Sequence, residues 1–314
     1  MLDQLDRKIL QILETDARQS KIKIAEQLGV SKTQVTYRVN RLEKNGIIKG
    51  YKYISNQAVL GLLSFGLLIR FQSLFLEEQT QILNRMQMSK KFNWVAATNG
   101  HWDAIAVAID NDVHSFNRRL DGFFARYGTH IKEYNFYIDY EGSISGLNYL
   151  YKEPYSRAVA YQNSGSSIIL SDLELQVYHK LQYNPQLSLL SIAKQLDKTY
   201  DTIKAKYQAL VAKGILLRPA PVINHELLGY TDTICMYNIA PNPERITKLL
   251  EFCVENPSIV RYSRCHGHFN FILNIHSRDS KHLKETIGII NKRFSDIIIS
   301  YDPIQTVDIQ RGVR

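Results

Sequence analysis

Residues 5–51 have the sequence LDRKILQILETDARQSKIKIAEQLGVSKTQVTYRVNRLEKNGIIKGY, and this stretch decides the fold. Its apolar residues first recur at the spacing of two short amphipathic helices. Gly29 can end the second helix in the left-handed conformation, and Ser31 then occupies the N-cap position of a third. Helix, helix, tight turn and helix is the plan of a helix-turn-helix, and the alternating residues 47–54 are predicted to form its wing.

The third helix of this first head (residues 1–56) is expected to bury Val35, Val39 and Leu42. The opposite face would then carry a forked arginine and an amide, the side chains best suited to the major groove. Residues 32–44 include four basic residues against one acidic residue. We predict that the residues contacting DNA are Lys32, Thr33, Gln34, Tyr37, Arg38 and Arg41, with Arg41 pointing away from the head. The alternative is a solvated face of an ordinary helical unit.

The chain contains an internal repeat. A shift of 168 residues pairs Ile24-Ala25 with Ile192-Ala193 and Gly46-Ile47 with Gly214-Ile215, and the shift is 167 by Gly100 and Gly267. A register that holds across ordered glycines and apolar pairs indicates duplication. We therefore predict a second, degenerate winged helix-turn-helix in the second head (residues 169–224).

Each head is followed by a predicted β-α-β-β-α-β pattern. In the first half its elements are residues 62–71, 77–91, 94–98, 104–109, 113–127 and 131–140, and in the second half 231–239, 243–255, 259–266, 269–275, 280–294 and 297–307. The predicted fold is α+β with five parts: 1–56, 57–145, a linker 146–168, 169–224 and 225–314. The Ser/Gly run that ends residues 141–167 predicts a flexible connector, whereas the Tyr-rich residues 148–161 can instead pack on a neighbouring domain.

The first head resembles the DNA-binding head of the Lrp/AsnC family. Its LDxxD start, DAR, IAxxLGVS, RVxRLExxGII and GY elements occur in the order seen there. The resemblance implies that each βαββαβ unit is a ferredoxin-like (RAM-type) domain for assembly and for sensing small molecules, often amino acids. It also implies double-stranded DNA as a partner, bound by the outward residues of the 31–44 helix. Because such domains pair between subunits, we expect an intrachain pseudo-dimer and a homo-oligomer.

A turn in each half resembles the family's Gly-x-x-Asp effector loop. In the first half Gly100, His101 and Asp103 would hold an amino-acid-like effector with backbone amides and a carboxylate. The equivalent Gly267, His268 and Asn270 replace the carboxylate with an amide, which predicts weaker binding of an α-amino group. The alternative for both turns is a glycine hairpin with solvated polar ends.

The second head keeps its apolar core but loses much of its surface decoration. Lys32, Thr33 and Gln34 correspond to Tyr200, Asp201 and Thr202. An acidic residue near the start of a DNA-contacting helix faces phosphates unfavourably, although it can accept from a cytosine amine. We expect a structural or lower-specificity copy in which Lys204 and Lys206 are the remaining DNA contacts. On this view Arg41→Ala costs about 1–3 kcal/mol of binding if Arg41 contacts a base, and Lys204→Ala costs less.

One constellation favours an enzyme instead. Tyr262, Arg264 and His266 alternate along a predicted strand and so share a face, resembling the Tyr-x-Arg-x-His pattern of the siroheme decarboxylases. The first half has no matching arginine, and an intact DNA-binding head fits that activity poorly. We therefore predict no enzyme, with no catalytic residues, cofactor or metal site. A purely protein-binding role with both heads idle is the third alternative.

Composition narrows the classes of partner and of location that the protein can have. The formal charge of +9 and the pI near 9.3 favour a polyanionic partner. No apolar run reaches the length of a membrane span, and the first residues lack a signal-peptide pattern, so we expect a cytoplasmic protein with no membrane partner. The three cysteines, Cys235, Cys253 and Cys265, have no CxxC spacing and indicate neither a disulfide framework nor a zinc site.

Overall fold

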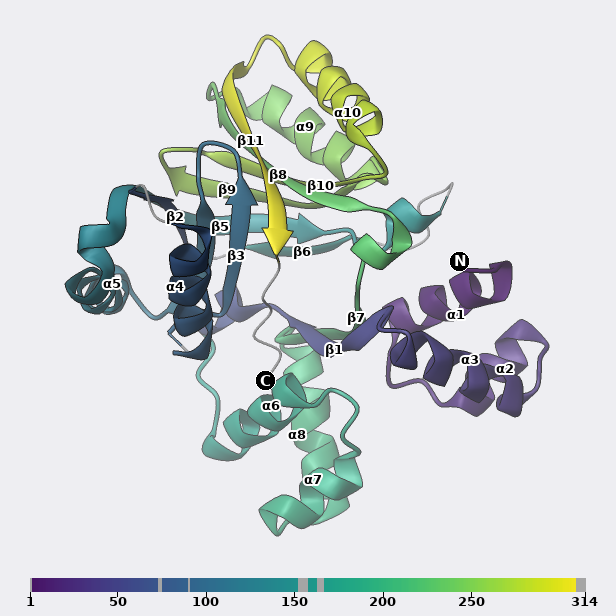
Figure 1. Cartoon of the computed structure of the whole chain (residues 1–314). Coiled ribbons are helices and arrows are strands. Elements are labelled where there is room, and N and C mark those ends of the chain that lie inside the picture. Colours follow the sequence, from purple (N-terminus) through teal and green to yellow (C-terminus); the bar gives the residue numbers. More distant parts are fainter. Residues whose placement is uncertain (1, 73–74, 90, 152–157, 163–166, 309–314) are drawn as a thin grey trace. The chain divides into compact units, whose positions relative to one another are not determined.

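The computed structural model describes residues 2–72, 75–89, 91–151, 158–162 and 167–308 (Figure 1). Its described residues form two compact units. The head unit comprises those of residues 1–60 and 166–230, and the sheet unit comprises those of 61–165 and 231–312. None of the described helices is both long and apolar enough to span a membrane.

The first head has the predicted helical plan, with α1 Gln4–Thr15, α2 Lys21–Leu28, α3 Lys32–Lys44 and the strand β1 Ile48–Ser55. Gly29 ends α2 at a φ of +66°, and the Ser31 hydroxyl accepts a hydrogen bond from the Gln34 amide at 3.1 Å. Val35, Val39 and Leu42 are buried, which confirms the predicted inner face of α3.

The second head repeats these elements as α6 Asp172–Tyr183, α7 Leu189–Leu196, α8 Tyr200–Ala212 and β7 Leu216–Ile223. Each of these elements begins and ends 168 residues after its counterpart in the first head. Asp197 replaces Gly29 and ends α7 in the left-handed conformation, as Asp can. Thr199 replaces Ser31, and its hydroxyl caps α8 through the Thr202 amide.

The two heads are joined by their strands. β1 pairs antiparallel with β7, and the ladder is bounded by reciprocal bonds, Asn56 N–H to Ile215 O at 2.9 Å and Asn224 N–H to Ile47 O at 2.8 Å. The residues predicted to form the wing of the first head thus form a strand whose partner belongs to the second head. Tyr53 of β1 packs into the apolar core of the second head, so the strands connect the two cores.

The sheet unit contains two RAM-like βαββαβ units. The first consists of β2 Leu63–Phe71, α4 Leu76–Met88, β3 Trp94–Asn99, β4 Ala104–Asp110, α5 Val113–Tyr127 and β5 Ile131–Ile144. The second consists of β8 Thr231–Ile239, α9 Pro243–Glu255, β9 Ile259–Gly267, β10 Phe271–Ser277, α10 Ser280–Arg293 and β11 Ile298–Asp308. Single-turn 3-10 helices occupy Gln57–Leu60, Gly128–His130, Asn148–Leu150 and Glu226–Leu228. The predicted elements are present, although α4 ends three residues earlier and β5 runs four residues longer than expected.

The two four-stranded sheets join at both edges. The order β2-β4-β3-β11-β8-β10-β9-β5 is closed by the pairing of β5 with β2, so the strands form a ring. The joints are β3 with β11 and β5 with β9, both antiparallel. The two halves of the chain therefore pair with each other through their sheets, as the intrachain pseudo-dimer requires.

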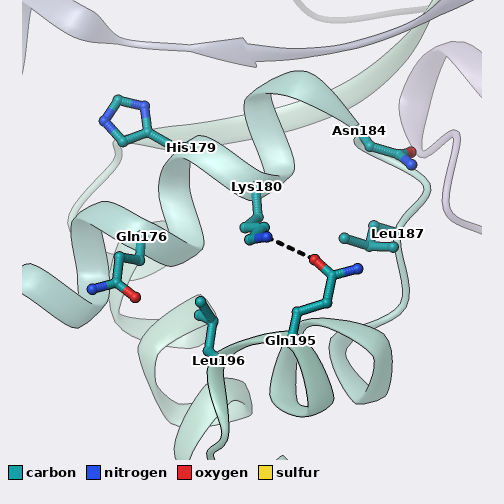
Figure 2. A pocket seen from close by; sticks show the side chains of 7 residues that line it. All are labelled: Gln176, His179, Lys180, Asn184, Leu187, Gln195 and Leu196. Carbon is teal, nitrogen blue, oxygen red and sulfur yellow. Dashed lines mark hydrogen bonds between the residues drawn. The ribbon is translucent and has the colours of Figure 1, made fainter.

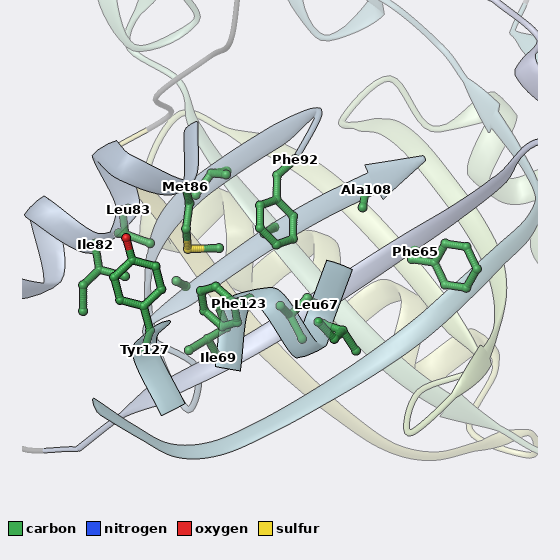
Figure 3. Close-up of a cluster of buried hydrophobic side chains, with 14 of the residues drawn as sticks. Phe65, Leu67, Ile69, Ile82, Leu83, Met86, Phe92, Ala108, Phe123 and Tyr127 are labelled. Carbon is green, nitrogen blue, oxygen red and sulfur yellow. The ribbon is translucent and has the colours of Figure 1, made fainter. Parts of the chain in front are cut away.

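Apolar residues fill both sides of this ring. Between α4, α5 and their sheet lies a core that includes Phe65, Leu67, Met86 and Phe123 (Figure 3). A matching core lies under α9 and α10. A third cluster lies on the opposite face of the strands and combines strand residues of both halves, such as Ile304, with the turn residues Trp102 and Phe269.

The segment between the halves is more than a linker. Residues 159–162 form the strand β6, which pairs antiparallel with the end of β5. Tyr149 and Leu150 are buried. The predicted packing of the Tyr-rich residues is confirmed for the described part of this segment, whereas most of the Ser/Gly run, residues 163–166, lies outside the described residues.

Candidate nucleic-acid interface and effector loops

The first turns of α3 present a compact polar surface. Lys32, Thr33 and Gln34 are exposed, and Tyr37 one turn later is 65% exposed. Asn40 continues the same face. The N-terminal end of a helix-turn-helix recognition helix is the part that reaches base edges. Four of the six residues predicted to contact DNA are therefore exposed in this part of α3.

Arg38 and Arg41 form ion pairs with Asp3 and Asp6 that the sequence did not predict. Arg41 Nη2 donates to Asp6 Oδ2 at 2.6 Å, and Arg38 Nη1 donates to Asp6 Oδ1 at 2.9 Å and also to Asp3. Asp6 is fully buried, and the side chains of Arg38 and Arg41 are only 18% and 37% exposed. The expectation that Arg41 points away from the head is wrong, because its long side chain turns back to neutralise a buried carboxylate.

These ion pairs change the electrostatics of α3. Once Asp3 and Asp6 are counted with the helix, its four basic residues face three acidic ones instead of one. The Arg38 guanidinium also holds the pKa of Asp3 below its usual value. Lys32 and Lys44 are exposed on α3, so they supply its free positive charge.

In the second head the corresponding exposed face is that of α8. Tyr200 is 45% exposed, and Asp201 and Lys204 are exposed, whereas Lys206 is half-buried. The buried acid of α1 has a counterpart in Glu174 of α6, which pairs with Lys213 at 2.7 Å. This bond and the Ser171 amide lower the pKa of Glu174 to about 2.

The second head also carries a pocket of about 610 Å³ between α6 and α7 (Figure 2). Its lining residues are Gln176, His179, Lys180, Asn184, Leu187, Gln195 and Leu196. Lys180 Nζ donates to Gln195 Oε1 at 2.8 Å across it. The sequence did not predict this pocket, because its residues come from two helices and the segment between them and form no motif.

The first predicted effector loop is built into the sheet unit. Gly100 has a φ of +144°, and a Cβ there would lie 2.9 Å from Ile304 of β11. Trp102 is fully buried in the cluster between the sheets. Asp103 Oδ2 accepts the Phe71 amide at 2.8 Å. This carboxylate therefore secures the end of β2, so it is not wholly available to a ligand.

The second loop makes the same connection with an amide. Asn270 Oδ1 accepts the Ile239 amide at 2.8 Å, and its Nδ2 donates to the Ile239 carbonyl at 2.9 Å. A Cβ at Gly267 would lie 2.5 Å from the Phe136 carbonyl. The replacement of Asp103 by Asn270 thus keeps a structural bond while it removes the charge.

One histidine from each loop influences the pKa of the same carboxyl group, that of Asp302. Burial raises the pKa of Asp302 on β11, and the charges of His101 and His268 oppose this rise. His101 Nε2 also lies 3.4 Å from Glu133. The loops of the two halves therefore share an electrostatic environment.

The alternating residues of β9 do not gather into a site. Tyr262 is buried in the apolar core under α9 and α10. Arg264 forms an ion pair with Glu141 at 2.7 Å, and exposed His266 stacks on Tyr140. Of the three residues of the decarboxylase alternative, Tyr262 and Arg264 are thus occupied by packing and by an ion pair. Among the described residues, no group of His, Cys, Asp and Glu side chains is arranged to hold a metal ion.

A buried polar cluster at the β5–β9 joint was missed. Asp139 Oδ2 accepts from Arg261 at 2.7 Å, Tyr161 at 2.9 Å and Ser263 at 3.1 Å. Burial raises the pKa of Asp139 although Arg261 opposes the rise. The members of this cluster come from three segments that are distant in the sequence, so no motif predicts it. The available sequence signal was an acidic residue, Asp139, at an inward position of a predicted strand. The three cysteines are buried and free, and burial raises the pKa of each thiol.

Comparison with known proteins agrees with the geometry of the first head. Residues 2–49 match the winged helix-turn-helix DNA-binding family. The HTH-type transcriptional regulator LrpA of Pyrococcus horikoshii is 48% identical over 61 residues, which cover 19% of this chain and 43% of LrpA. The HTH-type transcriptional regulator Ptr1 of Methanocaldococcus jannaschii is 35% identical over 120 residues, which cover 38% of this chain and 80% of Ptr1. The chain belongs to the Lrp/AsnC family.

Two solved structures of one protein cover almost the whole of this Lrp/AsnC-family chain. The siroheme decarboxylase NirDL matches with a TM-score of 0.66 at 13% identity, covering 99% of this chain and 93% of NirDL. Its complex with an iron-uroporphyrin III analogue matches with a TM-score of 0.65. At this identity the likeness shows a shared fold, in which the duplicated arrangement of family units recurs.

Proposed function

We propose that the chain is a sequence-specific DNA-binding regulator of transcription that acts in the cytoplasm without enzymatic activity. The observation that carries the proposal is the exposed polar surface of Lys32, Thr33, Gln34 and Tyr37 on a Ser-capped helix. An amide can form two hydrogen bonds with the N6 and N7 atoms of adenine in the major groove, and lysines around it can contact phosphates. Membership of the Lrp/AsnC family supports the same partner.

In this proposal residues 169–224 form a second winged helix-turn-helix. Their helices have the bounds of the first head shifted by 168, and α8 has the same capped start as α3. Gln34, Thr33 and Tyr37 make the base contacts of the first head. Arg38 and Arg41 act by holding α3 against α1.

The test compares binding to a selected duplex with binding to a random duplex at one stated salt concentration, because phosphate contacts make affinity depend on salt. Gln34→Ala is expected to lower the ratio of the two affinities about tenfold, the loss of one good base contact. The matched control is Gln81→Ala, an exposed amide on α4 of the sheet unit. Equal affinity of the unmodified protein for both duplexes would contradict the proposal.

Regulation by an amino-acid-like effector is the second part of the proposal. Its support is the resemblance of the 99–103 loop to the family's effector loop. In addition, His101 and His268, one from each loop, both act to lower the pKa of Asp302. Calorimetry with a panel of amino acids is expected to show one site per chain, because Asn270 lacks the charge of Asp103. Two equal sites would contradict this part.

The decarboxylase alternative has a direct test. Burial of Tyr262 and pairing of Arg264 with Glu141 weigh against a tetrapyrrole site there. Addition of an iron porphyrin is therefore expected to leave the Soret band as in buffer. A shifted band that Arg264→Ala abolishes would favour the enzyme.

A further inference from the structure

We propose that the DNA site of this protein consists of two unlike half-sites, one contacted by α3 and the other by α8. This inference rests on the proposed DNA-binding function and adds the class of duplex that is bound. Its basis is a symmetric scaffold that carries two different surfaces.

The scaffold of the head unit has an internal two-fold relation. In the β1–β7 ladder Lys52 lies opposite Ala220, the residue 168 positions later. Tyr51 lies opposite Pro221 and Tyr53 lies opposite Pro219. Replacing each residue of one pair by its repeat counterpart, 168 positions away, gives the other pair. The reciprocal bonds at the ends of the ladder obey it as well. Two equal heads on such a scaffold would bind a palindrome, as symmetric helix-turn-helix dimers do.

The exposed faces of the two helices are not equal. From the cap onward α3 presents Lys32, Thr33, Gln34 and Tyr37, where α8 presents Tyr200, Asp201, Thr202 and Ala205. At the C-terminal end Glu43 and Lys44 correspond to Val211 and Ala212, and Val211 is 42% exposed. Neither base preference nor phosphate attraction can be the same for both helices.

The surface of α8 still has groups suited to bases. Asp201 lies in the first turn and is exposed, and a carboxylate accepts a hydrogen bond from the cytosine amine but repels the acceptors of other bases. Lys204 and Gln208 follow on the same exposed side. The first half-site is expected to favour adenine opposite Gln34, and the second to favour cytosine opposite Asp201.

The experiment is selection of duplexes from a random pool by the full chain, followed by affinity measurements. The expected consensus has two half-sites that are not inverted copies. Asp201→Asn is expected to weaken the cytosine preference about tenfold in the second half-site and to leave the first unchanged. A palindromic consensus, or a single half-site with no preference beyond it, would overturn the inference while leaving the DNA-binding proposal standing. Retention of no duplex above background would overturn both.

A gain-of-symmetry variant provides an independent readout. The change combines Tyr200→Lys, Asp201→Thr, Thr202→Gln and Ala205→Tyr, which transfers the surface of α3 to α8. Because these positions lie outside the apolar core, the melting temperature should stay close to that of the unmodified chain. The variant is expected to select a palindrome built from the first half-site. A consensus unchanged from that of the unmodified chain would show that α8 does not contact bases.

Discussion

The ion pairs behind α3 give a prediction that separates a base contact from a structural one. Asp6 is fully buried and accepts hydrogen bonds from Arg38, Arg41 and the Asp3 amide. Arg41→Ala removes one charge-assisted bond and leaves Arg38 in place. We expect a loss of about 1–2 kcal/mol in the local stability of the first head.

Replacement of Asp6 should lower the stability of the first head more than replacement of Arg41. Asp6→Ala leaves two guanidinium groups without their buried partner, and breaking a buried pair costs about 3–5 kcal/mol. Because Arg38 and Arg41 retain some exposure, the lower end, about 3 kcal/mol, is expected. In the double variant Asp6→Ala with Arg41→Ala the losses should not add, since the two residues share one interaction.

Amide hydrogen exchange of α1–α3 measures these local stabilities, and duplex binding measures specificity on the same samples. Arg41→Ala is expected to weaken protection while the ratio of selected to random duplex affinity stays within about twofold. The reasoning is refuted if Arg41→Ala leaves exchange unchanged and lowers that ratio tenfold, because Arg41 would then contact a base.

Three further predictions concern stability. Glu174 has a lowered pKa of about 2, so its pairing with Lys213 stabilises the fold above pH 4.5 and this contribution, about 1–2 kcal/mol, is lost as the pH falls from 4.5 towards 2; Lys213→Met should flatten the stability profile measured by denaturation in that window. Gly66→Ala would place a Cβ 2.0 Å from the Tyr137 ring, and we expect a loss of about 2–4 kcal/mol that Tyr137→Ala partly relieves, measured by the denaturation midpoint. Tyr53→Ala should open the core of the second head, with a loss of about 3 kcal/mol visible as faster exchange in α6 and α8 although the change lies in the first half; exchange altered only in α1–α3 would contradict the strand arrangement.

Helix boundaries followed from local signals in the sequence. Gly29 and Ser31 fix the turn between α2 and α3 because each acts on its neighbouring backbone alone. The repeat then transferred the same boundaries to the second head, where Asp197 and Thr199 perform the same roles. Local chemistry was therefore enough to place the helices of the two heads, whereas α4 ends three residues earlier than predicted.

Partners across the chain were harder to predict. Alternation in residues 47–54 indicates a strand, but it does not say that the strand pairs with residues 216–223. A helical wheel gives the direction in which Arg41 leaves α3, whereas the reach of a guanidinium back to Asp6 depends on where α1 lies. The cluster around Asp139 was invisible for the same reason, since its residues meet only after both sheets have joined.

The closed ring of the sheet unit limits how copies of this protein can associate. Unpaired outer strands expose amide and carbonyl groups that recruit extended peptides or further chains. Here the four strands that would be outermost in the two four-stranded sheets are already bonded to each other, β3 to β11 and β9 to β5. Among the described residues, backbone recruitment is thus left to the short strand β6, which ends the strand order, and to the two-stranded β1–β7 ladder. Elsewhere self-association would use side chains on the helices or loops, with its specificity set by surface complementarity.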